Sequence, residues 1–284
     1  MNEGDILSSK IVFGFGDPPS RILDDVHIHL RREGGLHSYT YQPISLNFAA
    51  LERSFSIMQS HDVLGCHFAL PLQINQLPWL GTFSPAAQSS GYVNVLYKEA
   101  STLIGENTIV SGALRALEKA GFKASEADAL LLGTNNEAQS IVRSLAQRGL
   151  KKLLILHNSN EVMRSLAFNL KREAPELSVM IGSLSSEDLG SLLDSISLVI
   201  NALPLAAADG YDSRLIISNA PQNFIICDLV AVSLQAFNTS NESDNYINAS
   251  HLLLWEICEN YRLWNKREAP IDLLIKFLNN AEYS

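Results

Sequence analysis

The chain has 284 residues, 46% of them hydrophobic and 18% charged, fractions typical of a globular protein with one large or two smaller domains. A formal net charge of −9 argues against direct binding of nucleic acid, because that binding depends largely on Lys and Arg side chains that contact phosphates. The polar, acidic N-terminus does not read as a signal peptide, no apolar run is long enough to span a membrane, and the three cysteines are widely spaced, so we expect an intracellular protein, nuclear or cytoplasmic.

The first third of the chain alternates predicted strands with predicted helices, which indicates an α/β unit. Short apolar or alternating runs predict strands over 11–15, 39–43, 63–70, 93–96 and 104–105. Apolar residues at helical spacing predict helices over 24–32 and 46–58.

The stretch from Ala129 to His157 predicts the first crossover of a doubly wound sheet. A short leucine run ends at Gly133, an amphipathic helix ends at Gly149, and a second buried strand follows. The same reasoning predicts further elements in this half: strands over 130–132, 153–156, 178–181, 198–201 and 224–227, and helices over 110–120, 139–148, 162–172 and 189–194.

The turn after the first of these strands lacks most glycines of a dinucleotide site. Only Gly133 remains, followed by Thr134, Asn135 and Asn136, whose side chains occupy the space that a phosphate needs. Glu137 adds a carboxylate at the helix N-terminus, where it favours the helix dipole but repels a phosphate. The sequence therefore predicts the scaffold of a nucleotide site without its chemistry, and no cofactor.

The end of the chain is expected to be a polar loop over 237–248 and two helices over 251–264 and 271–281. Cys66 and Cys258 are expected to be buried apolar residues, and Tyr261 and Trp264, one helical turn apart, to be core anchors. No spacing of His, Cys, Asp and Glu predicts a metal site.

Several Gly, Pro and Asn landmarks resemble the shikimate dehydrogenase family from about residue 12 to residue 270. The retained landmarks are Gly16-x-Pro18, Gly65 with Pro71, Gly91-x-Val93-Asn94, Gly105-x-Asn107-Thr108 with Gly112, Gly133, Asn201-Ala202-x-Pro204 and Asp228. The resemblance implies an α/β fold with a small substrate-type domain, a Rossmann-like doubly wound parallel-sheet domain, and C-terminal helices that return to the first domain. We expect the boundaries 1–109, 110–248 and 249–284.

Most positions that bind substrate or transfer a proton in the family have a different residue here. The family's Ser-Leu-Ser turn reads Ile22-Leu23-Asp24, and an anion at Asp24 repels a carboxylate substrate. The family's Asn-Val-Thr-x-Pro-His-Lys segment corresponds to residues 67–73, which begin at His67, have Ala69 in place of Thr and end at Gln73. A neutral amide therefore stands where the family has the lysine of proton transfer. Ile109 occupies the position of the carboxylate that partners this lysine in the family, and Glu256 occupies the position of the substrate-binding Gln. Of the substrate-pocket positions, only Asn94 matches the family.

The cofactor positions are altered as well. The family's Asn-Arg-Thr, whose Arg meets a 2′-phosphate, reads His157-Asn158-Ser159. The degenerate cofactor positions are Gly133, Thr134, Asn135, Asn136 and Asn158. Because the losses concentrate at binding and catalytic positions while structural Gly and Pro persist, the chain resembles a degenerate member, a pseudoenzyme.

A degenerate dehydrogenase domain resembles the last domain of the fungal quinate repressors. That resemblance implies repression of quinate or shikimate utilisation genes through contact with an activator protein, without DNA or membrane binding by this domain. Two alternatives stay open. One is a metabolite-binding sensor of the quinate/shikimate pathway. For the pocket itself, Asp24, His67, Gln73 and Glu256 are either ordinary polar residues of a disused cleft or part of a repurposed pocket. In the repurposed pocket, a different small molecule, neutral or cationic, is bound by His67, Gln73, Asn94, Asn107 and Glu256. A divergent NAD(P)-dependent shikimate or quinate dehydrogenase is opposed by the absence of any lysine between Lys10 and Lys98.

Overall fold

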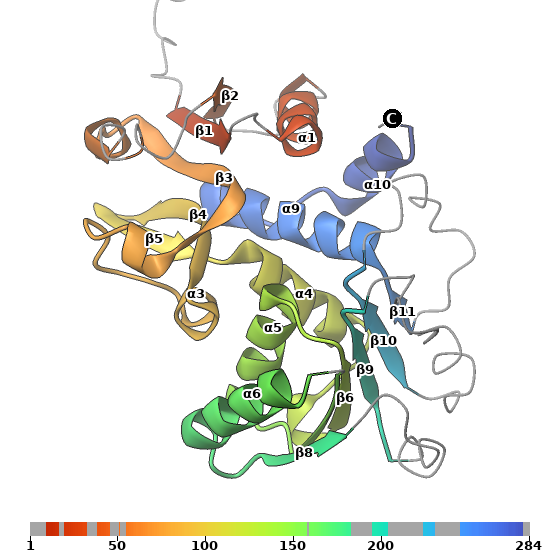
Figure 1. The fold of residues 1–284 in the computed structure, drawn as a ribbon. Coiled ribbons are helices and arrows are strands. Elements are labelled where there is room, and N and C mark those ends of the chain that lie inside the picture. Colours follow the sequence, from red (N-terminus) through yellow and green to blue (C-terminus); the bar gives the residue numbers. More distant parts are fainter. Residues whose placement is uncertain are drawn as a thin grey trace, which may run out of the picture. The chain divides into compact units, whose positions relative to one another are not determined.

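The structure, a computed structural model, describes residues 10–16, 20–32, 39–45, 51, 55–157, 159–182, 195–203, 224–230 and 245–280 (Figure 1). The chain divides into two compact units. The first unit comprises residues 1–108 and 256–284, and the second comprises residues 109–255. From the sequence we expected a first domain that ends at 109 and C-terminal helices that begin at 249.

A five-stranded mixed sheet forms the centre of the first unit. Its order is β2-β1-β3-β4-β5, in which β1 is parallel to β2 and β3, while β4 is antiparallel to β3 and β5. The strands are β1 (Lys10–Gly16), β2 (Tyr39–Ser45), β3 (Val63–Gln73), β4 (Tyr92–Glu99) and β5 (Thr102–Glu106). All five predicted strands of this unit are therefore present, with longer bounds.

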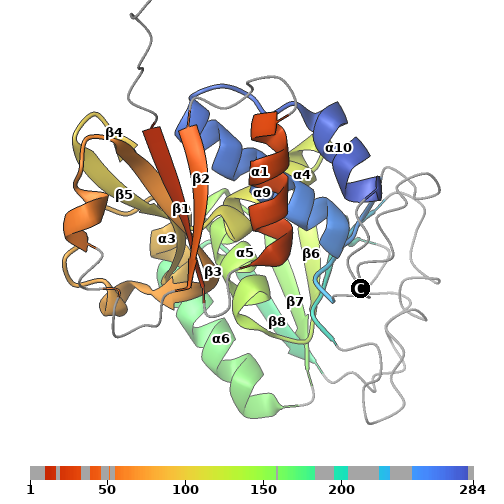
Figure 2. The same ribbon diagram turned by 90° about the horizontal axis from the view of Figure 1, so that it is seen from above.

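Helix α1 (Arg21–Arg32) and the C-terminal helices belong to this same unit (Figure 2). Helix α10 (Ile271–Asn280) packs against α1, and the rings of His29 and Phe277 stack with centroids 4.3 Å apart. In the part of α9 (Ala249–Asn265) that lies in the unit, Trp264 donates from Nε1 to the Leu96 carbonyl at 3.2 Å. The predicted return of the C-terminal helices to the first domain is confirmed.

The buried core of the first unit includes the predicted anchors. Tyr261 and Trp264 are 1% and 4% exposed, so their prediction as core residues is confirmed. Cys66 and Cys258 are buried as expected. Burial raises the pKa of the Cys66 thiol well above its ordinary value, which makes the thiolate unfavourable.

A six-stranded parallel sheet forms the centre of the second unit. Its order is β11-β10-β9-β6-β7-β8, so that the chain starts in the middle at β6, winds outward to β8 and returns to the other side at β9. This is the strand order of a Rossmann fold. The strands are β6 (Asp128–Leu132), β7 (Lys152–Leu156), β8 (Ser178–Gly182), β9 (Leu198–Asn201), β10 (Ile225–Asp228) and β11 (Tyr246–Ile247).

The central strands are leucine-rich because both of their faces are buried. Leu130, Leu131 and Leu132 are fully buried in β6. The helices of this unit include α5 (Asn136–Gln147) and α6 (Asn160–Glu173), while α4 (Thr108–Lys119) begins at the last residue of the first unit. Short 3-10 turns lie at Ile74–Gln76 and Ala124–Glu126. The α/β fold with a Rossmann-like sheet is confirmed.

Three differences from the sequence prediction have physical reasons. The predicted loop over 237–248 contains β11, because Tyr246 and Ile247 pair with Ile226 and Cys227 at the sheet edge and Ile247 is buried. Strand β3 continues through Pro71 because the β3–β4 register is interrupted between His67 and Leu72, so no ladder bond is needed there. Helix α3 (Pro85–Ser90) was not predicted, because its six residues are too few to show a helical period; its ends are set by Ser84, whose side chain accepts from the Ala87 N–H, and by Gly91 at φ +75°.

Two predicted helices are not fully covered by the described residues. Residues 189–194 lie outside them, and of 46–58 only residue 51 and residues 55–58 are described, all helical. Among the helices of the described ranges, none combines the length and the apolar character needed to span a bilayer.

Candidate functional site

Neighbouring strands of the first unit bring a set of polar side chains together. Gly14 in β1 pairs with His67 in β3, and His67 pairs with Val95, the residue after Asn94 in β4. We call the resulting group of buried or mostly buried residues the polar cluster; its members are Asp24, Tyr41, His67, Asn94, Thr108 and Glu256.

Asn94 links the two chain segments of the first unit, because it is hydrogen-bonded to Thr108 of the first segment and to Glu256 of the second. Its Nδ2 donates to Glu256 Oε1 and to Thr108 Oγ1, each at 3.0 Å. Its Oδ1 accepts from the Thr108 backbone N–H at 2.7 Å and from Thr108 Oγ1 at 3.2 Å. Because Asn94 is only 1% exposed and both its amide atoms are hydrogen-bonded, its orientation is fixed by these contacts.

Glu256 and His67 form a contact between a carboxylate and an imidazole. His67 Nε2 lies 3.7 Å from Glu256 Oε1, and the two side chains are 3% and 13% exposed. The same carboxylate oxygen accepts the Asn94 hydrogen bond, whereas the 3.7 Å to His67 is longer than a hydrogen bond. This arrangement places a carboxylate where the family resemblance expects a neutral amide.

Asp24 adds a second acidic group to the polar cluster. The Tyr41 hydroxyl donates to Asp24 Oδ1 at 2.9 Å, and Asp24 is 7% exposed. Burial raises the pKa of Asp24 above its ordinary value, although the Tyr41 hydrogen bond and the charge of His67 lower it in part. Burial also raises the pKa of Tyr41 well above its usual range, so its hydroxyl remains a donor.

A buried carboxylate outside the polar cluster, Glu106, was not predicted. Glu106 Oε1 accepts from Ser84 Oγ at 2.7 Å and from the Asn107 backbone N–H at 2.8 Å. Burial raises the pKa of Glu106, and the two bonds lower it in part. Asn107, a predicted pocket residue, also donates from Nδ2 to Ser90 Oγ at 3.0 Å, so these hydrogen bonds tie it to Ser90 and Glu106.

The remaining predicted substrate positions do not join the polar cluster through a polar contact. Gln73 is exposed at the end of β3, and its backbone N–H donates to Gln76 Oε1 at 3.0 Å. Ile22, Ala69 and Ile109 are half-buried residues without side-chain polar atoms, and Ile109 follows Thr108 in α4.

Lys10 and Lys98, the lysines on either side of position 73 in the sequence, are remote from the polar cluster. Lys98 lies four residues beyond Asn94 along β4, a distance of about 13 Å for an extended strand. Its ammonium donates to the Ser60 carbonyl at 2.6 Å. Lys10 lies four residues before Gly14 in β1, again about 13 Å along the strand, and donates to the His61 carbonyl at 2.9 Å. Neither replaces a lysine at position 73.

The turn between β6 and α5 does not fit the pyrophosphate of a dinucleotide. Gly133 has φ +72°, and a Cβ there would lie 2.9 Å from Leu203 Cδ2, so the residue is required by the turn itself. Asn135 Oδ1 accepts from the Ala138 N–H at 2.7 Å, which occupies a donor that an anion at the helix N-terminus would use. Glu137 places a carboxylate in the same first turn.

The other predicted cofactor positions are Thr134, Asn136 and Asn158. Thr134 is half-buried and Asn136 is the exposed first residue of α5, while Asn158 lies outside the described residues. Asp228, at the end of β10, accepts from Asn201 Nδ2 at 2.9 Å and from the Tyr246 hydroxyl at 2.7 Å. These bonds join three adjacent strands. Within the described ranges, no group of three His, Cys, Asp or Glu side chains is arranged to hold a metal ion.

Comparison with known proteins supports the resemblance that the landmarks predict. No protein-family model matches the chain. The shikimate dehydrogenase (NADP(+)) of Desulforamulus reducens is 25% identical over 248 residues, covering 85% of each chain. The shikimate 5-dehydrogenase of Listeria monocytogenes, solved in complex with shikimate and NAD, is 17% identical with a TM-score of 0.74 and covers 98% of this chain and 99% of its own.

The same fold also serves another substrate. The ligand-free 5-ketofructose reductase of Gluconobacter sp. strain CHM43 is 17% identical with a TM-score of 0.76, and covers 96% of this chain and 98% of its own. Sequence and fold therefore relate this chain to the shikimate dehydrogenases, as predicted, whereas the fold by itself does not fix the substrate.

Proposed function

We propose that this chain, a relative of the shikimate dehydrogenases, does not catalyse their hydride transfer and has kept the scaffold for a regulatory role. The observation that carries the proposal is the exposed Gln73 at the position of the family's lysine. A side-chain amide does not titrate at physiological pH and so cannot act as a general acid or base, and Ile109 stands where the family has a carboxylate. The ammonium groups of Lys10 and Lys98 donate to backbone carbonyls of His61 and Ser60, in the turn before β3.

The polar cluster supports the loss of an acidic substrate. Asp24 and Glu256 are both mostly buried, so each carboxylate would repel an incoming carboxylate in a medium that screens charge poorly. Asn94 has the family's identity, but its amide nitrogen is already shared between Thr108 and Glu256. Shikimate and quinate are both carboxylates, so we expect weaker binding than in a dehydrogenase.

The regulatory role that we propose is repression of quinate or shikimate utilisation through contact with a transcriptional activator. Its support is the family resemblance together with the negative net charge, which favours action through protein rather than DNA. The test is reconstitution with the purified activator of a quinate-utilisation gene cluster. A saturable complex, insensitive to added DNA, is the expected result. Binding to DNA alone would contradict the proposal.

A metabolite sensor is the second candidate, because the His67–Glu256 contact and Asn94 give a buried set of donors and acceptors without a catalytic lysine. Isothermal titration with quinate and shikimate tests this candidate. The sensor is favoured if quinate or shikimate binds without turnover and if Glu256→Gln increases the affinity. We expect that increase because the substitution removes the repelling charge and restores the family's amide.

The dehydrogenase alternative rests on the relatives, which are named as enzymes. It requires that another group replace the lysine. His67 beside Glu256 is the titratable pair closest to Asn94, and His67→Gln would abolish turnover if this pair were the acid–base catalyst. Our proposal predicts that the unmodified chain has no turnover to abolish.

A further inference from the structure

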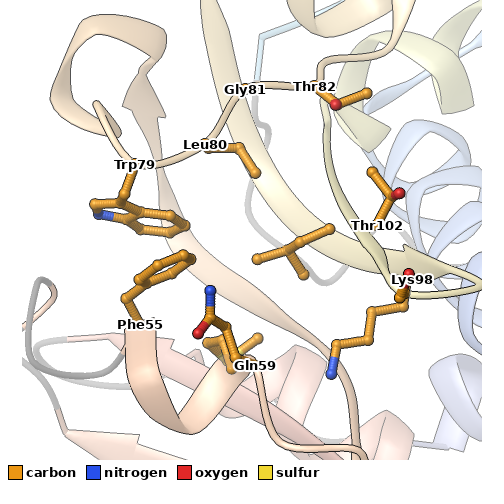
Figure 3. Close-up of a pocket in the computed structure, with 11 residues that line it drawn as sticks. Phe55, Gln59, Trp79, Leu80, Gly81, Thr82, Lys98 and Thr102 are labelled. Carbon is orange, nitrogen blue, oxygen red and sulfur yellow. The ribbon is translucent and has the colours of Figure 1, made fainter.

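The first unit contains a pocket that is separate from the polar cluster. Its volume is about 410 Å³, within the range of small-molecule sites (Figure 3). It lies among the helical residues 55–58, the segment 79–82 and the β4–β5 hairpin. Its described lining residues are Phe55, Met58, Gln59, Trp79, Leu80, Gly81, Thr82, Lys98, Ser101, Thr102 and Leu103.

One wall of the pocket is aromatic. The rings of Phe55 and Trp79 lie side by side, with centroids 4.3 Å apart and an interplanar angle of 33° (Figure 3). Both side chains are only half-buried, so part of each ring is available to a ligand. Leu80 and Met58, which also line the pocket, are 5% and 2% exposed and belong to the hydrophobic core. A flat apolar group suits this wall and floor.

The segment that carries the aromatic wall is held in place by backbone bonds. The Leu80 N–H donates to the Leu77 carbonyl at 3.0 Å, and the Gly105 N–H donates to the Thr82 carbonyl at 3.0 Å. The Ser84 N–H donates back to the Gly105 carbonyl at 2.8 Å. The segment 79–82 is therefore fastened to β5 at one end and to the 3-10 turn at the other, and the pocket is formed before a ligand enters.

The opposite side of the pocket carries its charge. Lys98 is the charged residue among the described lining residues, and Figure 3 shows its stem along the side facing the aromatic wall. Its ammonium keeps two donors after the bond to the Ser60 carbonyl. Burial and the nearby charge of Lys10 lower the pKa of Lys98, while the charge of Asp62 raises it in part, and a bound anion would further favour the protonated form.

We propose that this pocket binds a small aromatic carboxylate, with the ring against Phe55 and Trp79 and the carboxylate at Lys98. A single ammonium favours a monoanion over a phosphate dianion, which usually takes an arginine or several donors. Gln59 and Thr102, which also line the pocket, offer further polar groups at its rim. An amine is disfavoured because the described lining has a cation and no carboxylate.

The test uses the full chain and the indole N–H resonance of Trp79 in a ¹H–¹⁵N spectrum, identified by its loss in Trp79→Phe. We expect benzoate to shift this resonance saturably and to leave Trp255 and Trp264 unchanged. Benzamide, which has the same shape without the charge, should bind at least about tenfold more weakly. Inorganic phosphate should bind more weakly than benzoate.

Two lysine variants and a matched control complete the test. Lys98→Met should weaken benzoate at least about tenfold, while Lys98→Arg, which keeps the charge, should stay within about threefold. Lys123→Met, at an exposed lysine of the second unit, should change nothing. Equal binding of benzoate and benzamide, tighter binding of phosphate, or no shift of Trp79 would overturn the proposal. None of these results depends on dehydrogenase or repressor activity.

Discussion

Gly14 lies where the smallest side chain is needed in the polar cluster. A Cβ at this position would collide with the Tyr41 hydroxyl and would lie 2.8 Å from Asp24 Oδ1. Gly14→Ala should therefore lower the free energy of unfolding by about 1–3 kcal/mol, the usual cost of forcing extra volume into a packed site. Urea unfolding measures this loss.

Gly81→Ala is the matched control, because a Cβ at Gly81 meets nothing within 4 Å. We expect a change within about 0.5 kcal/mol. Equal losses in the two variants would show that the collision at Gly14 is relieved by movement of the Tyr41 side chain.

Asp24 should make stability depend on pH in a defined direction. Its pKa is raised in the folded protein, mainly by burial, so the folded state binds the proton more tightly than the unfolded state. Its contribution is fully present below the unfolded pKa of about 3.9 and is lost as the pH rises through the folded value. Asp24→Asn keeps an acceptor for Tyr41 and removes this loss.

The measurement is the unfolding free energy of both proteins from about pH 3.5 to 7. The stability of Asp24→Asn relative to the wild type should increase with pH across this window and be constant below it. Asp25→Asn, an exposed change of the same charge on the same helix, should show a smaller dependence. A relative stability that falls with rising pH would contradict the burial argument.

The sequence predicts some members of the polar cluster and misses others for a simple reason. Family landmarks point to Asp24, His67, Asn94 and Glu256, because each occupies a position with a known role in the resemblance. Tyr41 carries no such landmark, and its bond to Asp24 depends on β2 lying beside β1. Pairings of this kind come from sheet topology, which residue identities do not encode locally.

Asn135 is the N-cap residue of α5. Its side chain caps α5 through the Ala138 N–H at 2.7 Å. Asn135→Ala should lower the free energy of unfolding by about 1 kcal/mol, the typical cost of losing an N-cap. Ser159→Ala is the comparison, because Ser159 caps α6 with a longer bond of 3.4 Å. We expect a smaller loss there, measured from urea unfolding midpoints at constant slope.

The elements that were predicted well are those with a strong pattern. A leucine run that ends at Gly133 located β6, a second buried apolar run located β7, and amphipathic spacing located α5 and α6. The two-residue strand β11 follows a polar stretch and has no alternation of its own. Its place comes from pairing with β10 and from the Tyr246 bond to Asp228, both long-range contacts.

The chain has the fold of the solved shikimate dehydrogenases that it resembles. The strand order of the second unit and the mixed sheet of the first follow from crossovers and hairpins, which depend on turn glycines and apolar periodicity. Gln73, Ile109 and Asn135 are not core residues, so the identity of these three residues has little weight in the fold. Our proposal is therefore that the fold persists here without the groups that perform the family's chemistry.

The most direct measurement is a dehydrogenase assay of the purified chain with shikimate or quinate and with NADP or NAD, beside the Desulforamulus reducens enzyme as positive control. We predict no reduced cofactor above the no-enzyme rate, because position 73 has no titratable group and the β6–α5 turn offers no phosphate site. Saturable turnover that His67→Gln or Glu256→Gln abolishes would contradict the account and establish an enzyme with a different acid–base pair.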